Sequence, residues 1–326
     1  PMVVNSDERQ WTWMDEGLNT FLQFLTEQAW EEGYPSRRGE PAKMTEYMAS
    51  ATQVPIMTNS ESIHQFGNNA YGKPATALNI LRESIMGREL FDHAFRQYAE
   101  RWRFRRPTPA DFFRTMEDAS AMDLDWFWRG WFYGTGHVDV ALGEVALYRV
   151  DSLDPEREKA WERAQAESEE PSLSDQRNAG SERLVDREPG LRDFYNESDE
   201  YRVTPWDYAQ YEEALDRLTE RERALLDTAE RFYVVTFDNV GGLVTPLPLR
   251  ISYGDGAVEE ITVPAEIWRR NASRVKKLFI TEREITAIEF DPYRSTADTN
   301  VANNAWPRKV VPSRFQLFKE SEEPNP

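Results

Sequence analysis

The first 137 residues place their hydrophobic side chains at helical spacing. In the first such stretch, apolar residues recur at three- and four-residue intervals and predict a helix with one apolar face; they are Met14, Leu18, Phe21, Leu22, Leu25 and Ala29. Similar spacing predicts helices over 89–101 and 109–120. Another helix is expected to begin near Pro74, because proline is favoured in a first helical turn, and to stop near Gly87. We therefore expect a helical subdomain over residues 1–137.

A period of two replaces this pattern in residues 138–150 and again in 231–293. Val138 to Leu142 and then Val145 to Val150 alternate, and Gly143-Glu144 offers a turn between two strands. Further alternating runs are predicted to be strands; they cover 233–237, 249–253, 261–263, 278–280 and 285–290. Gly254-Asp255-Gly256 is a strong hairpin signal. Several short strands at this spacing favour a β-sandwich, so the predicted fold class is α+β.

Residues 151–230 interrupt the strand pattern with a polar, acidic stretch. Its first part, 151–200, holds 16 Asp and Glu against 7 Lys and Arg, which is typical of a solvated insertion. Residues 207–230 return to roughly helical spacing, so the insertion is expected to be partly helical. The tail over 294–326 contains Pro307, Pro312 and an acidic end, and is expected to wrap the surface or fray.

Composition narrows the possible partners. The 326 residues suffice for two domains, and 40% hydrophobic with 30% charged residues is ordinary for a globular chain. Asp and Glu outnumber Lys and Arg by 58 to 39, giving a net charge of -19, which argues against nucleic acid or an anionic membrane as a partner. The absence of cysteine excludes disulfides and thiolate metal sites. No apolar run has transmembrane length, and the compartment is not indicated.

Two short motifs carry candidate chemistry. Glu16 lies in Trp13-Met14-Asp15-Glu16-Gly17, in the first turn of the opening helix, where an acid can simply complement the helix dipole. Tyr71 lies in Asn69-Ala-Tyr-Gly-Lys73-Pro74, just before a predicted helix. A phenol there can donate a hydrogen bond to a developing oxyanion, or it can only cap or pack against the helix. Lys73 is either an exposed first-turn lysine or a residue that holds the Tyr71 loop or neutralises nearby acids.

In this order and at this separation, the two motifs resemble the W-x-N-E-G and Y-x-K elements of the M1 (gluzincin) zinc aminopeptidases. The resemblance implies that Glu16 is the third zinc ligand and that Tyr71 stabilises the tetrahedral intermediate. Asp15 stands where the family usually has Asn, and Pro74 where it usually has Gly. Neither departure removes a functional group.

The resemblance continues through Phe91–Gly136, Val240–Val244, and the Asp291-Pro292 and Asn303-Asn304 neighbourhoods. It implies the helical second half of a thermolysin-like catalytic domain, followed by a small β-sandwich with the acidic insertion. The implied activity is release of N-terminal residues from a peptide substrate.

A catalytic zinc site takes three protein ligands and leaves a position for water. Family spacing places the H-E-x-x-H motif before Pro1, so we expect the chain to begin just after it, and the isolated fragment to bind Zn²⁺ poorly and to be inactive. The histidines, His64, His93 and His137, lack the i, i+4 spacing of a helical zinc pair. His64 and His137 fall in loops near the presumed cleft, where they contact substrate or serve the structure; His93 falls in a helix.

The aromatic stretch Asp123–Tyr133 is explained by buried packing between helices or, alternatively, by a surface for stacking on substrate. Two other functions compete with the aminopeptidase. One is a non-catalytic binding or scaffold module of the same form, in which Glu16 and Tyr71 would not share a pocket. The other is a zinc hydrolase that acts on a different amide or on an epoxide.

Overall fold

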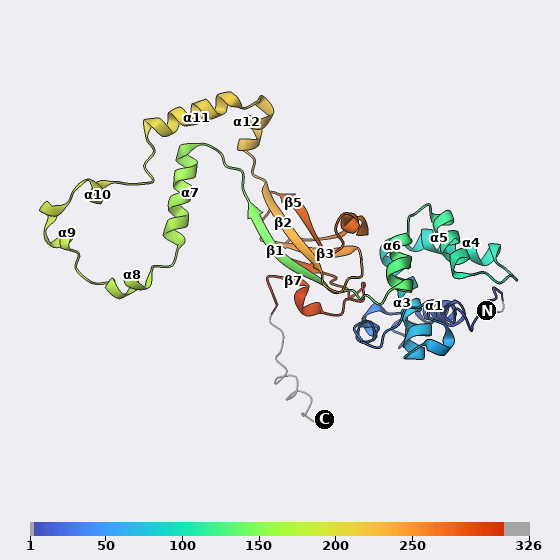
Figure 1. Cartoon of the computed structure of the whole chain (residues 1–326). Coiled ribbons are helices and arrows are strands. Elements are labelled where there is room, and N and C mark those ends of the chain that lie inside the picture. Colours follow the sequence, from blue (N-terminus) through green and yellow to red (C-terminus); the bar gives the residue numbers. More distant parts are fainter. Residues whose placement is uncertain (1–2, 310–326) are drawn as a thin grey trace. The chain divides into compact units, whose positions relative to one another are not determined.

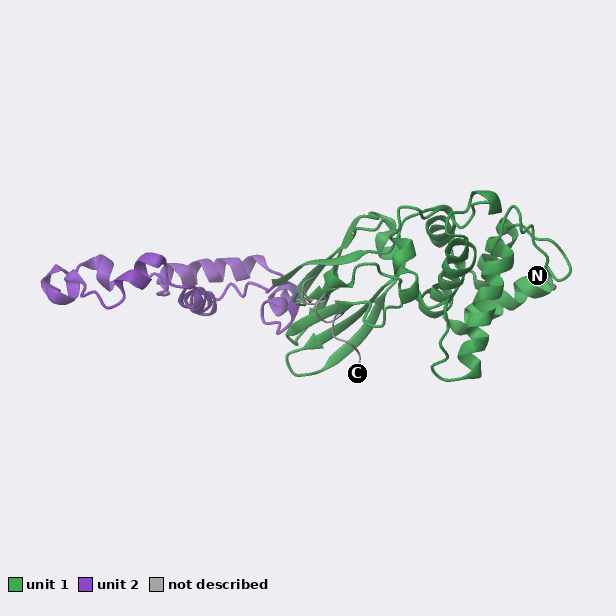
Figure 2. Cartoon of the chain, turned by 90° about the horizontal axis from the view of Figure 1, so that it is seen from below, with its two compact units in different colours: residues 1–147, 233–326 green, residues 148–232 purple. Residues whose placement is uncertain are grey.

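The computed structural model describes residues 3–309. The chain divides into unit 1, residues 1–147 and 233–326, and unit 2, residues 148–232 (Figure 2). Unit 1 contains helices and two sheets, which confirms the α+β class (Figure 1). No helix in the described part of the chain is both long and apolar enough to cross a membrane.

The opening helix, α1 (Trp13–Trp30), buries a face slightly different from the predicted one. Its buried side chains include Trp13, Phe21 and Phe24, whereas Leu22 is 44% exposed, so its assignment to the core face was wrong. The reason is tertiary. Gly17 faces Pro74, and a Cβ at this glycine would lie 2.6 Å from the Pro74 Cγ. On the same side of α1, the Trp13 ring packs against the rings of Phe112, Phe113 and Phe132.

The helix that carries Tyr71 begins earlier than predicted. A π-helical turn, η3 (Gly67–Gly72), runs directly into α3 (Lys73–Ile80) and then into a second π-helical turn, η4 (Leu81–Ile85). Pro74 lacks the N–H that a regular α-helix would use there, and the chain before it winds more widely. Tyr71 therefore lies inside a helix, and every residue of α3 is buried.

The remaining helices of unit 1 close around an aromatic core. They are α2 (Thr45–Met48), α4 (Arg88–Arg101), α5 (Pro109–Ser120) and α6 (Asp125–Trp128), which continues into the π-helical turn η5 (Arg129–Tyr133). Short 3-10 turns are η1 (Pro41–Lys43), η2 (Ser60–Ser62), η7 (Ala265–Arg269) and η8 (Val301–Asn303). The predicted range of α5, 109–120, is confirmed. The helix starts there because Thr108 and Asp111 form a capping box in front of it.

Two sheets form the second half of unit 1. One has the order β1-β2-β5 and consists of β1 (Val140–Tyr148), β2 (Arg231–Asn239) and β5 (Arg274–Thr281). The other has the order β4-β3-β6-β7, all antiparallel, and consists of β3 (Leu247–Tyr253), β4 (Val258–Val263), β6 (Ile285–Phe290) and β7 (Ala305–Trp306). The turn predicted at Gly143-Glu144 is wrong, because β1 runs straight through it. A Cβ at Gly143 would lie 3.2 Å from Asp238 of β2, so glycine permits close strand contact there.

Both sheets and the helices share one hydrophobic core. The backbone N–H of Ile285 in one sheet donates to the Tyr233 hydroxyl in the other, at 3.0 Å. Backbone hydrogen bonds also join the segment after η5 to the sandwich: His137 N–H donates to the Gly241 carbonyl, at 3.1 Å, and Thr299 N–H to the Val138 carbonyl, at 2.9 Å. The helical part is thereby tied to the sandwich within unit 1.

Unit 2 consists of short helices with few buried side chains. They are α7 (Pro155–Ser168), α8 (Leu173–Asn178), α9 (Leu184–Arg187), the 3-10 turn η6 (Pro189–Leu191), α10 (Phe194–Glu197), α11 (Pro205–Arg217) and α12 (Glu220–Leu226). The predicted helix over 207–230 is divided in two, because Thr219 and Glu222 form a capping box that starts α12. Most of the predicted C-terminal tail, 310–326, lies outside the described residues.

Candidate functional site

Glu16 and Tyr71 come together in the helical part of unit 1. The first turn of α1 carries Glu16, the turn η3 carries Tyr71, and these two elements pack against each other. The Tyr71 hydroxyl donates a hydrogen bond to Oε1 of Glu16. Both side chains are half-buried rather than solvated or enclosed in the core. The site thus presents a carboxylate and a phenol on one surface, accessible to a third group.

The surroundings of Tyr71 keep its phenol protonated. The hydrogen bond to Glu16 raises the pKa of Tyr71 to about 12, with smaller contributions from burial and from the negative charges of Glu16 and Asp15. The positive charge of Arg38 acts in the opposite direction on the same pKa. At neutral pH Tyr71 is therefore a hydrogen-bond donor, as an electrophilic stabiliser must be.

Arg38 is a residue of this neighbourhood that the sequence did not single out. Its guanidinium carbon lies 4.6 Å from the centroid of the Tyr71 ring, which is the geometry of a cation-π contact. The side chain is exposed. In the sequence it belongs to a polar loop between two prolines, and nothing in that pattern distinguishes it from its neighbour Arg37.

Lys73 is fully buried, so the prediction of an exposed first-turn lysine was wrong. Its Nζ donates to Gln53 Oε1 at 2.6 Å and to the Gly134 carbonyl at 3.3 Å. Burial lowers the pKa of Lys73 to about 7. Gln53 in turn donates to the Thr135 carbonyl at 2.9 Å. Lys73 therefore binds the helix of Tyr71 to the end of η5 through uncharged partners and does not neutralise an acid.

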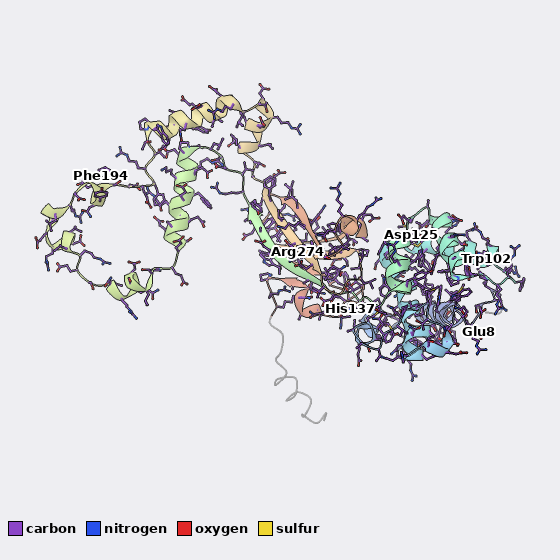
Figure 3. The ribbon with its side chains drawn as sticks, viewed as in Figure 1. Glu8, Trp102, Asp125, His137, Phe194 and Arg274 are labelled. Atoms are coloured by element: carbon purple, nitrogen blue, oxygen red, sulfur yellow. The ribbon has the colours of Figure 1, made fainter. Side chains whose placement is uncertain are left out.

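The histidines lie apart. His64 is exposed between η2 and η3, and His93 is exposed on α4. His137 lies at the junction with the sandwich, where its backbone pairs with the Gly241-Gly242 turn (Figure 3). A Cβ on Gly241 would lie 2.2 Å from the His137 carbonyl oxygen. His137 thus has a structural role through its backbone; contact of His64 or of the His137 ring with substrate stays a prediction.

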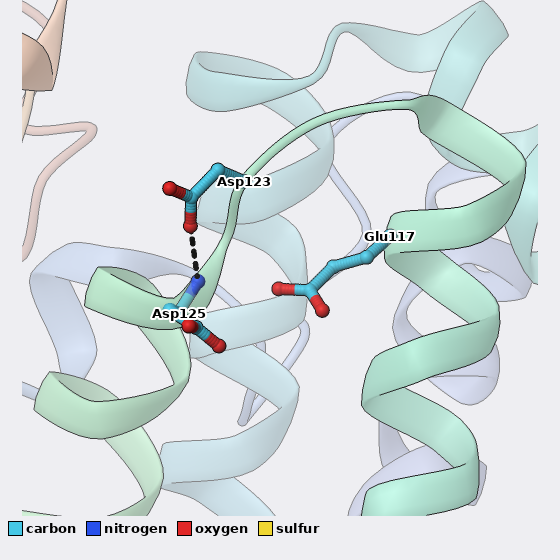
Figure 4. A group of neighbouring side chains, drawn as sticks. All are labelled: Glu117, Asp123 and Asp125. Carbon is cyan, nitrogen blue, oxygen red and sulfur yellow. Dashed lines mark hydrogen bonds between the residues drawn. The ribbon is translucent and has the colours of Figure 1, made fainter.

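Among residues 3–309, the group of acids close enough to share a metal ion is Glu117, Asp123 and Asp125 (Figure 4). These acids bind their own loop: Glu117 Oε1 accepts the Leu124 N–H at 3.1 Å, and Asp123 Oδ1 accepts the Asp125 N–H at 3.2 Å. Burial raises the pKa of Glu117. The cluster caps the turn between α5 and α6, and we assign no metal to it.

The aromatic stretch 123–133 is mostly packed inside. Phe127, Trp128, Trp131 and Phe132 are buried, and the Trp128 ring stacks on Phe113 with centroids 4.5 Å apart. Tyr133 is 53% exposed beside an open hollow of about 520 Å³ that Phe113 and Trp128 also line. Buried packing, the first of the two explanations, therefore accounts for this stretch.

Comparison with known families identifies the helical part. The Peptidase family M1 domain matches residues 3–131. This stretch belongs to the M1 peptidase family. The resemblance predicted from the motifs around Glu16 and Tyr71 is thereby confirmed, and the M1 segment (residues 3–131) also contains Arg38 and Lys73.

More distant comparisons add less. No curated protein matches the chain. Among solved structures, the crystal structure of Legionella pneumophila aminopeptidase A in complex with aspartic acid is similar, with a TM-score of 0.46 and 12% sequence identity. The match covers 94% of this chain and 25% of that one, so this chain spans about a quarter of its length. The likeness is too distant to bear on individual residues.

Proposed function

We propose that this chain is the C-terminal portion of a zinc-dependent M1-type aminopeptidase, which releases N-terminal residues from peptides, and that the chain alone is inactive. The observation that carries the proposal is the hydrogen bond between Tyr71 and Glu16, inside the M1 segment. The bond shows that the two side chains share one surface, which supports a site where one substrate carbonyl meets both the proposed ligand and the proposed electrophile. The family match supports the reaction class.

In this proposal Glu16 provides one ligand. Carboxylate oxygen is a normal zinc donor, and the half-buried Glu16 side chain is accessible enough to be one. No histidine in the described part of the chain joins Glu16 in a metal-binding group. The proposal assigns the two remaining zinc ligands to an H-E-x-x-H segment outside this chain. When bound, zinc supplies an activated water and polarises the scissile carbonyl.

Tyr71 acts on the oxygen of that carbonyl. Because its phenol is protonated at neutral pH, it can transfer its hydrogen bond from Glu16 to the oxygen on which negative charge develops. The buried Lys73 network joins the helix that carries Tyr71 to Gly134 and Gln53, which fixes the backbone from which the phenol projects. The donor is thus positioned before substrate arrives, and pre-positioned donors are the most effective in oxyanion stabilisation.

The proposal is tested with the polypeptide that includes the segment upstream of Pro1. We expect that segment to contain H-E-x-x-H, and the longer protein to hold stoichiometric zinc and to hydrolyse aminoacyl-4-nitroanilides. The present chain, measured beside it, should bind zinc weakly and hydrolyse none of them. Tight stoichiometric zinc in this chain, or a longer protein with neither zinc nor hydrolysis, contradicts the proposal.

Glu16→Gln tests the ligand within the longer protein. The amide keeps the size of the side chain but is a poorer zinc donor, so zinc content should fall and hydrolysis should fall with it. Asp15→Asn is the matched control, because it removes the adjacent negative charge without touching the ligand. A Glu16→Gln protein with normal zinc content would remove Glu16 from the metal site.

The competing scaffold module predicts that Glu16 and Tyr71 lie in separate surroundings. Their direct hydrogen bond gives that alternative no support. Zinc content measured in the longer protein separates the two functions, since a scaffold needs no metal at this site.

A further inference from the structure

We propose that Arg38 binds a carboxylate of the substrate, beside Tyr71. The inference rests on the proposed peptidase function and adds to it the class of group that the substrate presents next to the scissile bond. It starts from the position of the guanidinium, whose carbon lies 4.6 Å from the centroid of the Tyr71 ring. A ligand bound at the Tyr71 hydroxyl can therefore also contact Arg38.

The loop that carries Arg38 is held firmly in place. Ser36 is buried, and its carbonyl accepts a hydrogen bond from Lys43 Nζ. The Gly39 carbonyl accepts from Asn79 Nδ2 of α3 at 3.1 Å. Gly39 itself has φ +100°, and a Cβ there would lie 2.4 Å from the Phe24 ring of α1. The loop is therefore fixed to α1, which carries Glu16, and to α3, which continues directly from the turn η3 that carries Tyr71.

The start of η3, at Gly67, leaves room for the Arg38 guanidinium. A Cβ at Gly67, the first residue of η3, would lie 3.1 Å from Arg38 Nη2. Any larger residue at position 67 would push against the charged group. The fixed loop and the Tyr71 ring favour one position of the guanidinium before any ligand is bound, and the glycine leaves that position open. Such preorganisation lowers the entropic cost of binding.

The charge of Arg38 is available to a ligand. Other arginines of the helical part are paired within the chain: Arg82 with Asp92 at 2.7 Å, and Arg88 with Glu83 at 2.8 Å. For Arg38, no carboxylate lies within ion-pair distance among residues 3–309, although the whole chain has a net charge of -19. An exposed guanidinium presents several donors in the plane that matches a carboxylate.

The distances fit a short peptide. An extended chain advances roughly 3.3–3.6 Å per residue, so a carboxylate one or two residues from the carbonyl at Tyr71 reaches Arg38. Such a carboxylate has two sources: the C-terminus of a dipeptide or tripeptide, or the side chain of Asp or Glu beside the scissile bond. Both offer the same chemistry to Arg38, and substrates separate them.

The experiment uses the longer protein with zinc bound. Four substrates are compared by kcat/KM: alanyl-alanine with its free carboxylate, its amide, and the amides of alanyl-aspartate and alanyl-asparagine. The quantity measured is the ratio of kcat/KM for a carboxylate substrate to that for its neutral partner. Arg38→Gln should lower at least one of the two ratios about 10-fold or more, the loss expected for a charge-assisted hydrogen bond. Arg38→Lys should lower it less, because the charge remains and the paired donors do not.

Arg37→Gln is the matched control, since Arg37 is exposed in the same loop and is not over the Tyr71 ring; it should leave both ratios and the overall rate unchanged. A change confined to the dipeptide pair identifies the C-terminal carboxylate, and one confined to the aspartate pair identifies the side chain. Unchanged ratios in Arg38→Gln, or an equal loss on all four substrates, overturn the inference while leaving the peptidase intact. If the unmodified longer protein hydrolyses aminoacyl-4-nitroanilides but none of the four substrates, this inference fails and the proposed function stands. If it hydrolyses neither kind of substrate, both fail.

Discussion

Glu16 and Tyr71 are brought together by two elements that are far apart in the sequence. Their hydrogen bond joins residues 55 positions apart, and neither side chain is enclosed by the core. The carboxylate also raises the pKa of the phenol. A local interpretation of either residue, as a dipole-complementing acid or as a packed tyrosine, misses this pairing.

Replacing Tyr71 with Phe tests the role of the phenol. We expect zinc content of the longer protein to be unchanged and kcat to fall by roughly 10²-fold or more, the usual loss for one oxyanion donor. The ring remains, so the cation-π contact with Arg38 and the packing on Phe66 are retained. Turnover within a few-fold of normal would show that the phenol takes no part in the chemistry.

Replacing Lys73 with Met tests the buried amine through the pH dependence of stability. Burial lowers the pKa of Lys73 from 10.5 to about 7, so between these values the unfolded chain binds a proton that the folded chain does not. Stability should therefore rise with pH across this window, by up to about 1.4 kcal/mol per pH unit from this group. Below about pH 7 Lys73 is charged in both the folded and the unfolded chain, and the free-energy cost of burying its charge is fully present.

Urea unfolding of the present chain at pH values from 7 to 10 measures the effect. Lys73→Met should lose this part of the slope, whereas Lys276→Met, at an exposed position on β5, should keep it. Equal slopes in the two variants would mean that Lys73 stays charged in the folded protein.

At the scale of elements, the spacing between α1 and the helix of Tyr71 depends on one glycine. A Cβ on Gly17 would lie 2.6 Å from Pro74 Cγ and 3.2 Å from the Ala70 carbonyl oxygen. Because Gly17 adjoins Glu16, and Ala70 adjoins Tyr71, this contact also sets the separation of the two site residues. Packing and chemistry are linked at this crossing.

Gly17→Val should force the two helices apart. We expect a loss of about 1–3 kcal/mol in the free energy of unfolding, which is typical of overpacking, and weaker zinc binding in the longer protein. Gly190→Val is the control, because that glycine has no neighbour within 4 Å of a Cβ and an ordinary φ. Unchanged stability in Gly17→Val would mean that α1 can shift without cost, and that the glycine is not required for the crossing.

At the scale of the whole molecule, unit 2 is an insertion between two adjacent strands. β1 ends at Tyr148, β2 begins at Arg231, and the two are neighbours in the same sheet. Neighbouring strands lie about 4.8 Å apart, so a short turn can replace the 85 residues of unit 2, 148–232. Unit 1 has its own core without them.

A chain in which a short glycine-containing turn joins Leu147 to Tyr233 should fold. We expect its thermal midpoint to stay within a few degrees of the intact chain and, in the longer protein, hydrolysis of aminoacyl-4-nitroanilides to persist. Circular dichroism and the thermal transition check the first point, and kcat/KM the second. A deletion variant that fails to fold would show that unit 2 supplies stability to the sandwich.

The sequence by itself determined the local features. The limits of α5 follow from Thr108, Pro109 and Asp111, which act within one helical turn. Strand β3 follows from side chains that alternate between buried and partly exposed positions. The motifs around Glu16 and Tyr71 indicated the M1 family, because such motifs are short and continuous.

Only the tertiary structure decided what lies against what. It exposed Leu22, buried Lys73, placed Gly143 inside β1 rather than in a turn, and put Arg38 over Tyr71. Each of these outcomes depends on a neighbour that is distant in the chain. Gly17 of α1 lies against Pro74, and Lys73 donates to the Gly134 carbonyl. Gly143 lies beside β2, and Arg38 lies beside η3. Periodicity records how a segment alternates, but the free energy of burying a side chain is set by the surface that covers it.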